Sequence, residues 1–130
     1  MKYVSPLFFS SVNVTIYEQP IDVSVLAPGA AVLRCHADGQ PVPEIVWIRE
    51  IANGSRTEFN ISTGNINIAE INIAETPSGL NKTSILTIQP TTPQDIAMYS
   101  CRAQNLVGTA TSTDAQVNVF GKILISWLSV

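Results

Sequence analysis

The stretch Asp95-Ile-Ala-Met-Tyr-Ser-Cys101 decides the fold that this sequence predicts. From Ala97 onward, its odd-numbered residues would face a core and its even-numbered residues would face outward, which is the period-two pattern of a strand with one buried face. A polar corner, Pro90-Thr-Thr-Pro-Gln94, stands just before it and predicts a turn. A tyrosine two residues before a cysteine at such a corner can bury its ring and return its hydroxyl to nearby backbone.

Two residues far upstream complete a recognisable set, because Cys35 and Trp47 precede Cys101 in that order. Together with the corner tyrosine, this Cys-Trp-Cys frame resembles an immunoglobulin-like domain of the intermediate, or I-set, kind. The resemblance implies an all-β sandwich of two antiparallel sheets, joined by a disulfide between the two cysteines that the indole ring covers. The core signature that it implies consists of Trp47, Leu86, Asp95 and Tyr99.

The resemblance to I-set domains extends over residues 13–120. At three places the chain also resembles one particular group of these domains. Gly39-x-Pro-x-Pro-x-Ile-Val-Trp47, Leu86-Thr-Ile-Gln-Pro90 and Asn105-x-Val-Gly108 are similar to the first immunoglobulin domain of LAR-type receptor tyrosine phosphatases. In that family this domain implies adhesion and the binding of heparan sulfate through lysines that follow the Trp strand. Here the corresponding segment, residues 49–56, has two arginines, one glutamate and no lysine. Glycosaminoglycan binding is therefore doubtful for this chain.

The remaining pattern predicts further strands between turn signals. Asn53-Gly54 predicts a two-residue hairpin turn, residues 105–108 predict a tight hairpin, and Pro20 predicts a break between the first two strands. The last strand is predicted as one continuous segment. The predicted strands are Val14–Glu18, Ile21–Val25, Ala31–Ala37, Glu44–Arg49, Thr83–Gln89 and Thr109–Phe120.

Residues 66–75 are a perfect tandem repeat, Ile-Asn-Ile-Ala-Glu written twice. A repeat of five cannot keep isoleucine on one face of a strand, because Ile66 and Ile68 would face one way and the second pair the other unless a bulge intervenes. It also suits a helix poorly, since five residues turn the chain about 140° beyond a full circle. We predict a duplicated insert that is partly strand and partly loop.

Composition limits the class of protein. A chain of 130 residues with 45% hydrophobic residues is long enough for one domain with a substantial core. The net charge of −3 provides no basic field, so nucleic acid and anionic membrane surfaces are poor partners. We divide the chain into an N-terminal segment (1–12) that resembles part of a signal peptide, the domain (13–120) and an apolar C-terminal tail (121–130), and expect a fragment whose membrane anchor, if any, belongs to the parent protein.

Cysteines and glycosylation sequons bear on the compartment. Cys35 and Cys101 lie 66 positions apart; they are either free buried thiols of a cytosolic protein or a disulfide that would stabilise the fold by roughly 4 kcal/mol. Only 13% of the residues are charged, and glycans would offer another route to solubility. These features favour an extracellular or cell-surface protein of the secretory pathway. The four sequons are Asn13-Val-Thr15, Asn53-Gly-Ser55, Asn60-Ile-Ser62 and Asn81-Lys-Thr83, the last three expected on or near turns.

The sequence gives little support for an enzyme function. Cys35 and His36 are adjacent, so on a strand they would point to opposite faces and could not form a thiolate–imidazole pair. The single histidine has no partners at metal-ligand spacing, and neither a phosphate-binding loop nor a G-x-S-x-G motif occurs. We therefore expect no enzyme activity and no cofactor.

One surface is a candidate for binding a protein. If Trp47, Tyr99 and Cys101 face the core, the residues that alternate with them along their strands share the outer face of one sheet, with an apolar centre edged by polar groups. The alternative is that a neighbouring edge strand or the 51–75 segment folds over this surface. We call it the recognition face; it consists of Val46, Ile48, Met98, Arg102 and Gln104.

Two classes of function remain from the sequence. The first is an extracellular adhesion or receptor–ligand module with a protein partner, which includes an ectodomain piece of a receptor tyrosine phosphatase whose enzyme lies outside this chain. The second is an intracellular structural module of the muscle-filament kind, which also uses I-set domains. A disulfide and used sequons would favour the first class, whereas free thiols would favour the second.

Overall fold

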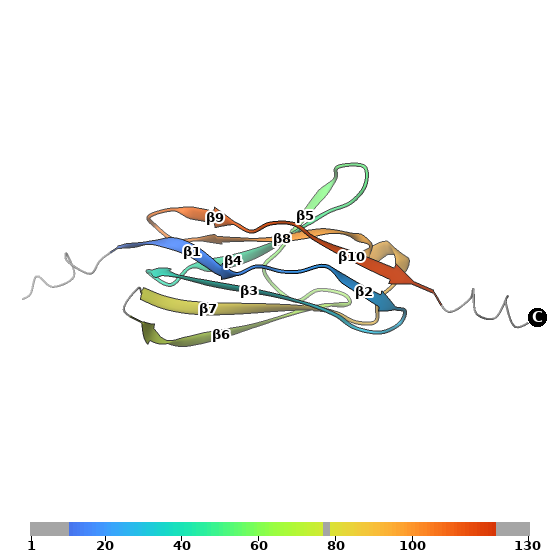
Figure 1. Ribbon diagram of the computed structural model, residues 1–130, viewed down its shortest axis with the longest axis horizontal. Helices are drawn as coiled ribbons and strands as arrows, with labels where there is room; N and C mark the ends of the chain where they lie inside the picture. The colour runs from blue at the N-terminus through green and yellow to red at the C-terminus, as the bar shows by residue number, and fades with distance from the viewer. Residues whose placement is uncertain (1–10, 77–78, 122–130) are drawn as a thin grey trace, which may run out of the picture.

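The computed structural model describes residues 11–76 and 79–121 and consists of two β-sheets packed face to face (Figure 1). One sheet has the strand order β1-β3-β7-β6 and the other the order β2-β10-β8-β4-β5, with β9 also paired to β8. The predicted all-β immunoglobulin-like sandwich is confirmed. Its strands are β1 (Val12–Glu18), β2 (Val23–Leu26), β3 (Ala31–Gln40), β4 (Glu44–Glu50), β5 (Arg56–Phe59), β6 (Ile66–Thr76), β7 (Gly79–Ile88), β8 (Ala97–Gln104), β9 (Thr109–Thr111) and β10 (Ala115–Phe120).

The core lies between β3 and β7 of one sheet and β4 and β8 of the other. A disulfide joins Cys35 on β3 to Cys101 on β8, with their Cα atoms 6.5 Å apart, as predicted. The Trp47 side chain is fully buried, and its indole nitrogen donates a hydrogen bond of 2.9 Å to Ser84 Oγ on β7. Both the covalent link and this hydrogen bond therefore connect the two sheets through the interior.

The turn just before β8 is bonded to that strand and fixes how it enters the core. The buried Tyr99 hydroxyl donates to the Asp95 carbonyl oxygen at 2.8 Å, which is the contact of a tyrosine corner. The Asp95 carboxylate, itself buried, accepts hydrogen bonds from the Thr92 backbone at 2.8 Å and from Asn65 Nδ2 at 3.0 Å. The short 3₁₀ turn Pro93–Asp95 is thereby held from both sides.

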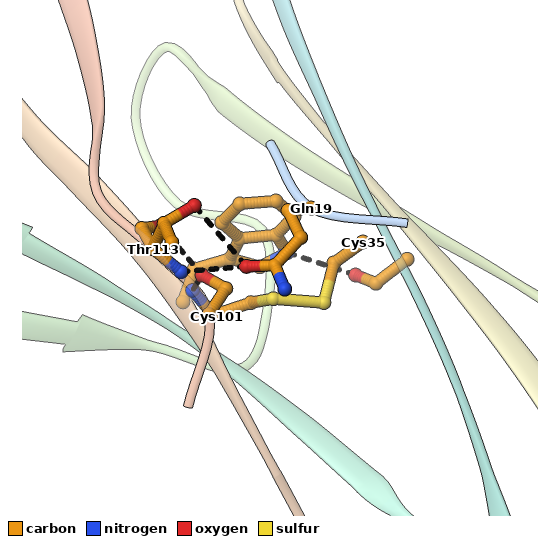
Figure 2. Close-up of a disulfide and its surroundings, with 7 residues drawn as sticks. Gln19, Cys35, Cys101 and Thr113 are labelled. Carbon is orange, nitrogen blue, oxygen red and sulfur yellow. Dashed lines mark hydrogen bonds between the residues drawn. A yellow bond between two sulfur atoms is a disulfide. The ribbon is translucent and has the colours of Figure 1, made fainter. Parts of the chain in front are cut away.

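The first strands switch sheets where the sequence predicts a break. Pro20 lies between β1, which pairs with β3, and β2, which pairs in parallel with β10 of the other sheet. Gln19 Oε1 accepts hydrogen bonds from the Thr113 backbone at 2.7 Å and from its hydroxyl at 3.1 Å, and Figure 2 shows this contact beside the disulfide. The parallel β2–β10 pair is the one departure from antiparallel pairing among the described strands.

The prediction of one continuous final strand is wrong. Residues 112–114 separate β9 from β10, because Ser112 turns inward, where its hydroxyl accepts a 2.9 Å hydrogen bond from the Cys101 backbone nitrogen. The Asn53-Gly54 prediction needs a smaller correction. The connection from β4 to β5 spans residues 51–55 instead of two, and Gly54 adopts a positive φ of 90° there.

The tandem repeat is a continuous strand, so the prediction of a part-strand, part-loop insert is wrong. β6 pairs antiparallel with β7 from Ile66 opposite Ile88 to Ile73 opposite Asn81, with a register shift before Thr76. The expected change of face does occur, since Ile66 is buried whereas Ile71 is 50% exposed. Backbone pairing with β7 therefore keeps the repeat extended as a strand, although its apolar residues do not all lie on one face. Most of the predicted N-terminal and C-terminal segments lies outside the described residues, as do Pro77 and Ser78.

Candidate recognition face

The recognition face lies on the outer side of β4 and β8, but its centre differs from the prediction. Met98 is 38% exposed and Gln104 is exposed, whereas Val46 and Arg102 are partly covered. Ile48 is buried, with only 6% of its surface exposed. The expectation of an exposed apolar centre around Val46 and Ile48 is therefore wrong for Ile48.

An ion pair crosses β4 on the same side as Ile48. Arg102 on β8 donates from Nη1 and Nη2 to the two carboxylate oxygens of Glu58 on β5, at 3.0 and 3.1 Å. β4 runs between these strands, with Val46 opposite Arg102 and Ile48 opposite Glu58. The pair therefore crosses β4 on its outer side, and the methylene stem of the arginine can cover apolar surface beneath it.

The two partners of this ion pair shift each other's pKa values in opposite directions. The hydrogen bond from Arg102 lowers the pKa of the Glu58 carboxyl, and the same bond raises the pKa of the Arg102 guanidinium. Both partners therefore stay charged over the physiological range. A bidentate arginine–carboxylate contact is planar and directional, so it presents a defined arrangement of charge to a partner.

A second ion pair extends the charged part of the face along β5. Arg56 Nε lies 3.2 Å from Glu50 Oε1, and the two residues stand directly opposite each other on β5 and β4. The recognition face thus combines exposed Met98 and Gln104 with two ion pairs. Sequence reasoning missed Glu58 and Arg56 because residues 56–59 carry no alternating pattern; three of the four are polar.

The sequons fall into two groups. Asn13, Asn53 and Asn60 are exposed, and Asn60 borders a cavity of about 160 Å³ between the two sheets, lined also by Glu44, Ile45, Val46, Glu70 and Lys82. Asn81 is buried at 6% exposure within β7, so the prediction that it lies on a turn is wrong. His36 on the neighbouring strand β3 contacts both polar residues of this sequon, with Nε2 2.8 Å from Asn81 Oδ1 and Nδ1 2.9 Å from Thr83 Oγ1.

The described residues hold neither a metal-site cluster nor a membrane-spanning helix. Among residues 11–76 and 79–121, no three His, Cys, Asp or Glu side chains gather as a metal site would require. Over the same ranges, no helix has the length and apolar character needed to cross a bilayer.

Comparison with known proteins identifies the family. A family model described as an immunoglobulin domain matches residues 14–105. The chain belongs to the immunoglobulin domain family. This immunoglobulin domain is 33% identical over 106 residues to the tyrosine-protein phosphatase Lar of Drosophila melanogaster, which covers 81% of the chain. It is 32% identical over 100 residues, or 75% of the chain, to the peroxidasin homolog pxn-2 of Caenorhabditis elegans.

Solved structures support the same relationship. The N-terminal Ig1-2 module of the Drosophila receptor protein tyrosine phosphatase DLAR superposes with a TM-score of 0.62 at 30% identity, covering 84% of this chain and 50% of that module. The resemblance of this immunoglobulin domain to LAR-type receptors is confirmed. The chain spans only 5% of the length of Lar and 6% of that of pxn-2.

Proposed function

We propose that this chain is a non-catalytic extracellular module for adhesion or receptor–ligand recognition, belonging to a larger cell-surface receptor, and that it binds a protein partner through the recognition face. The observation that carries the proposal is the bidentate Arg102–Glu58 pair, held across β4 beside exposed Met98 and Gln104. Directional charged groups around a partly apolar surface are typical of protein interfaces.

The disulfide supports an extracellular location over the intracellular structural class. Disulfides persist in oxidising compartments and are rare in the cytosol, and among the described residues both cysteines are bonded to each other. Similarity to a receptor phosphatase of which this chain matches only a small part supports a fragment whose enzyme, if present, lies in the rest of the parent protein.

Changing Met98 and Gln104 to glutamate together should weaken partner binding at least tenfold while leaving the fold intact. Both side chains are exposed, and two new carboxylates would disturb the charge balance of the recognition face. Self-association can be measured by aggregation of beads that carry the chain, and heterophilic binding by flow cytometry of intact cells. Ile48 is unsuitable for this test because its burial would make any substitution a test of stability.

Val32→Glu is the matched control, since Val32 is 47% exposed on β3 in the opposite sheet. It should leave binding unchanged. Equal losses for both variants, or full binding by the Met98/Gln104 variant at an unchanged melting temperature, would refute the assignment of the recognition face.

Asn13, Asn53 and Asn60 are proposed to carry N-linked glycans when the chain is secreted from eukaryotic cells, and Asn81 is not. Their side chains are exposed, whereas a glycan on Asn81 would need the strand and its contact with His36 to open. Asn→Gln variants, compared by intact mass before and after enzymatic deglycosylation, measure the occupancy of each site. The Asn81→Gln variant should show the same glycan mass as the unaltered chain; a loss of one glycan from it would contradict this prediction.

A further inference from the structure

The cavity of about 160 Å³ beside Asn60 lies where the chain crosses from β5 in one sheet to β6 in the other. β5 pairs with β4 over Trp47–Glu50, so residues 44–46, which line the cavity, lie beyond that pairing. Lys82 on β7 and Glu70 on β6 line it from the opposite sheet. The cavity is therefore a gap at the side of the sandwich, lined by charged groups as well as by the edge of β4.

The sequon Asn60-Ile-Ser62 is fixed beside this cavity. Ser62 Oγ accepts a hydrogen bond of 2.9 Å from the Ile68 backbone nitrogen on β6, and Thr63 and Ile66 exchange two backbone hydrogen bonds of 2.9 Å. The segment that follows β5 is therefore bonded to the edge of β6. Asn60, two residues before Ser62, is exposed and borders the cavity. Its side chain can thus carry a glycan that begins at the cavity itself.

The lining offers both donors and acceptors of hydrogen bonds. The Lys82 side chain is only 13% exposed, and its Nζ lies 3.5 Å from Glu70 Oε1. Charge-assisted hydrogen bonds are usually about 2.7–2.9 Å long, and an ammonium has three N–H donors, so Lys82 retains donors for a ligand. The carboxylates of Glu44 and Glu70 accept. A charged ligand would meet a like charge in this lining, whereas a neutral ligand with hydroxyl and amide groups can use donors and acceptors together.

We propose that the first sugar of the glycan on Asn60, an N-acetylglucosamine, lies in this cavity and is hydrogen-bonded by Lys82 and Glu70. The inference rests on the glycosylation of Asn60 proposed above. The cavity is smaller than the roughly 300–1,000 Å³ of sites for drug-sized ligands, which suits a single sugar ring. Because the sugar is attached at the rim, its effective concentration in the cavity is high, and a few weak contacts are enough to hold it.

The melting temperature of the trimmed glycoprotein tests this placement. The chain is secreted from eukaryotic cells with unprocessed high-mannose glycans, and an endoglycosidase then leaves one sugar at each occupied site. In this form Asn60→Gln should melt roughly 3–6 °C below the unaltered chain, the loss expected for about one net hydrogen bond. The same two chains made without glycans in a bacterial periplasm give the effect of the substitution alone, which is subtracted.

Asn53→Gln is the matched control, since Asn53 is exposed between β4 and β5 and does not line the cavity. After the same subtraction, its sugar should leave the melting temperature unchanged. Lys82→Met and Glu70→Gln test the lining itself. In each of these backgrounds the part of the melting temperature that depends on the Asn60 sugar should fall by more than half, because one of the two hydrogen-bonding partners is gone.

Intact mass separates a failure of glycosylation from a failure of the placement. Absence of a glycan from Asn60 would overturn both proposals. Three results would overturn the placement alone: an occupied Asn60 whose sugar does not raise the melting temperature, an equal rise from the sugar on Asn53, or a rise that either cavity variant retains in full.

Discussion

Replacing Cys35 and Cys101 together with alanine is expected to lower the free energy of unfolding by about 4 kcal/mol. The bridge closes a loop of 66 residues, and removing it returns that conformational freedom to the unfolded chain. Both cysteines are fully buried at the centre of the sandwich, so the lost sulfur atoms also leave space that the packed core cannot fill without cost. Urea unfolding followed by far-ultraviolet circular dichroism measures the change.

The unaltered chain treated with a thiol reductant is the control for the disulfide, because reduction opens the loop without removing the sulfur atoms. It should lose most of the same free energy. A loss below about 1 kcal/mol in both samples would show that the link between β3 and β8 contributes little to stability, contrary to the chain-entropy argument.

Trp47→Ala is the second large effect, with an expected loss of about 3–5 kcal/mol from lost apolar burial and the cavity together. The indole is fully buried, and its removal also leaves Ser84 Oγ without its donor in the interior. Trp47→Phe keeps much of the apolar volume but not the N–H group, and should cost about 1–3 kcal/mol. The difference between the two variants separates packing from hydrogen bonding.

Phe120→Ala provides the control for loss of an aromatic ring. Phe120 is 57% exposed at the end of β10, so its removal should cost less than about 1 kcal/mol. Chemical unfolding under the same conditions compares all three variants. If the loss for Trp47→Ala did not exceed that for Phe120→Ala, the sandwich would not depend on the indole between its sheets.

Much of the core could be predicted because its signals are local. Alternation in residues 97–101 and the corner before them are properties of a few neighbouring residues, and the structure places Tyr99 and Cys101 inward with the corner hydrogen bond formed. The buried pattern of Ser84, Leu86 and Ile88 along β7 follows the same period. Backbone geometry alone relates such residues to one side of a strand.

The outer surfaces were predicted less well because their burial depends on residues distant in sequence. Ile48 is buried on the outer face, and the ion pair that crosses β4 beside it joins Arg102 and Glu58, which are 44 positions apart and belong to different hairpins. Asn81 carries a sequon but lies beneath a histidine from β3. Strand register brings these groups together, and a local pattern does not specify register.

By itself, the sequence determined the two-sheet sandwich and the residues packed between its sheets, since these follow from a period of two, turn chemistry and the resemblance that the Cys-Trp-Cys frame carries, whereas the structure settled that Cys35 and Cys101 are bonded to each other. Only the tertiary structure decided which outward residues remain accessible and that the tandem repeat is an edge strand. The physical reason is that exposure on a sheet depends on which strands pair and on which side chains cross them, and those contacts form between segments far apart in the chain.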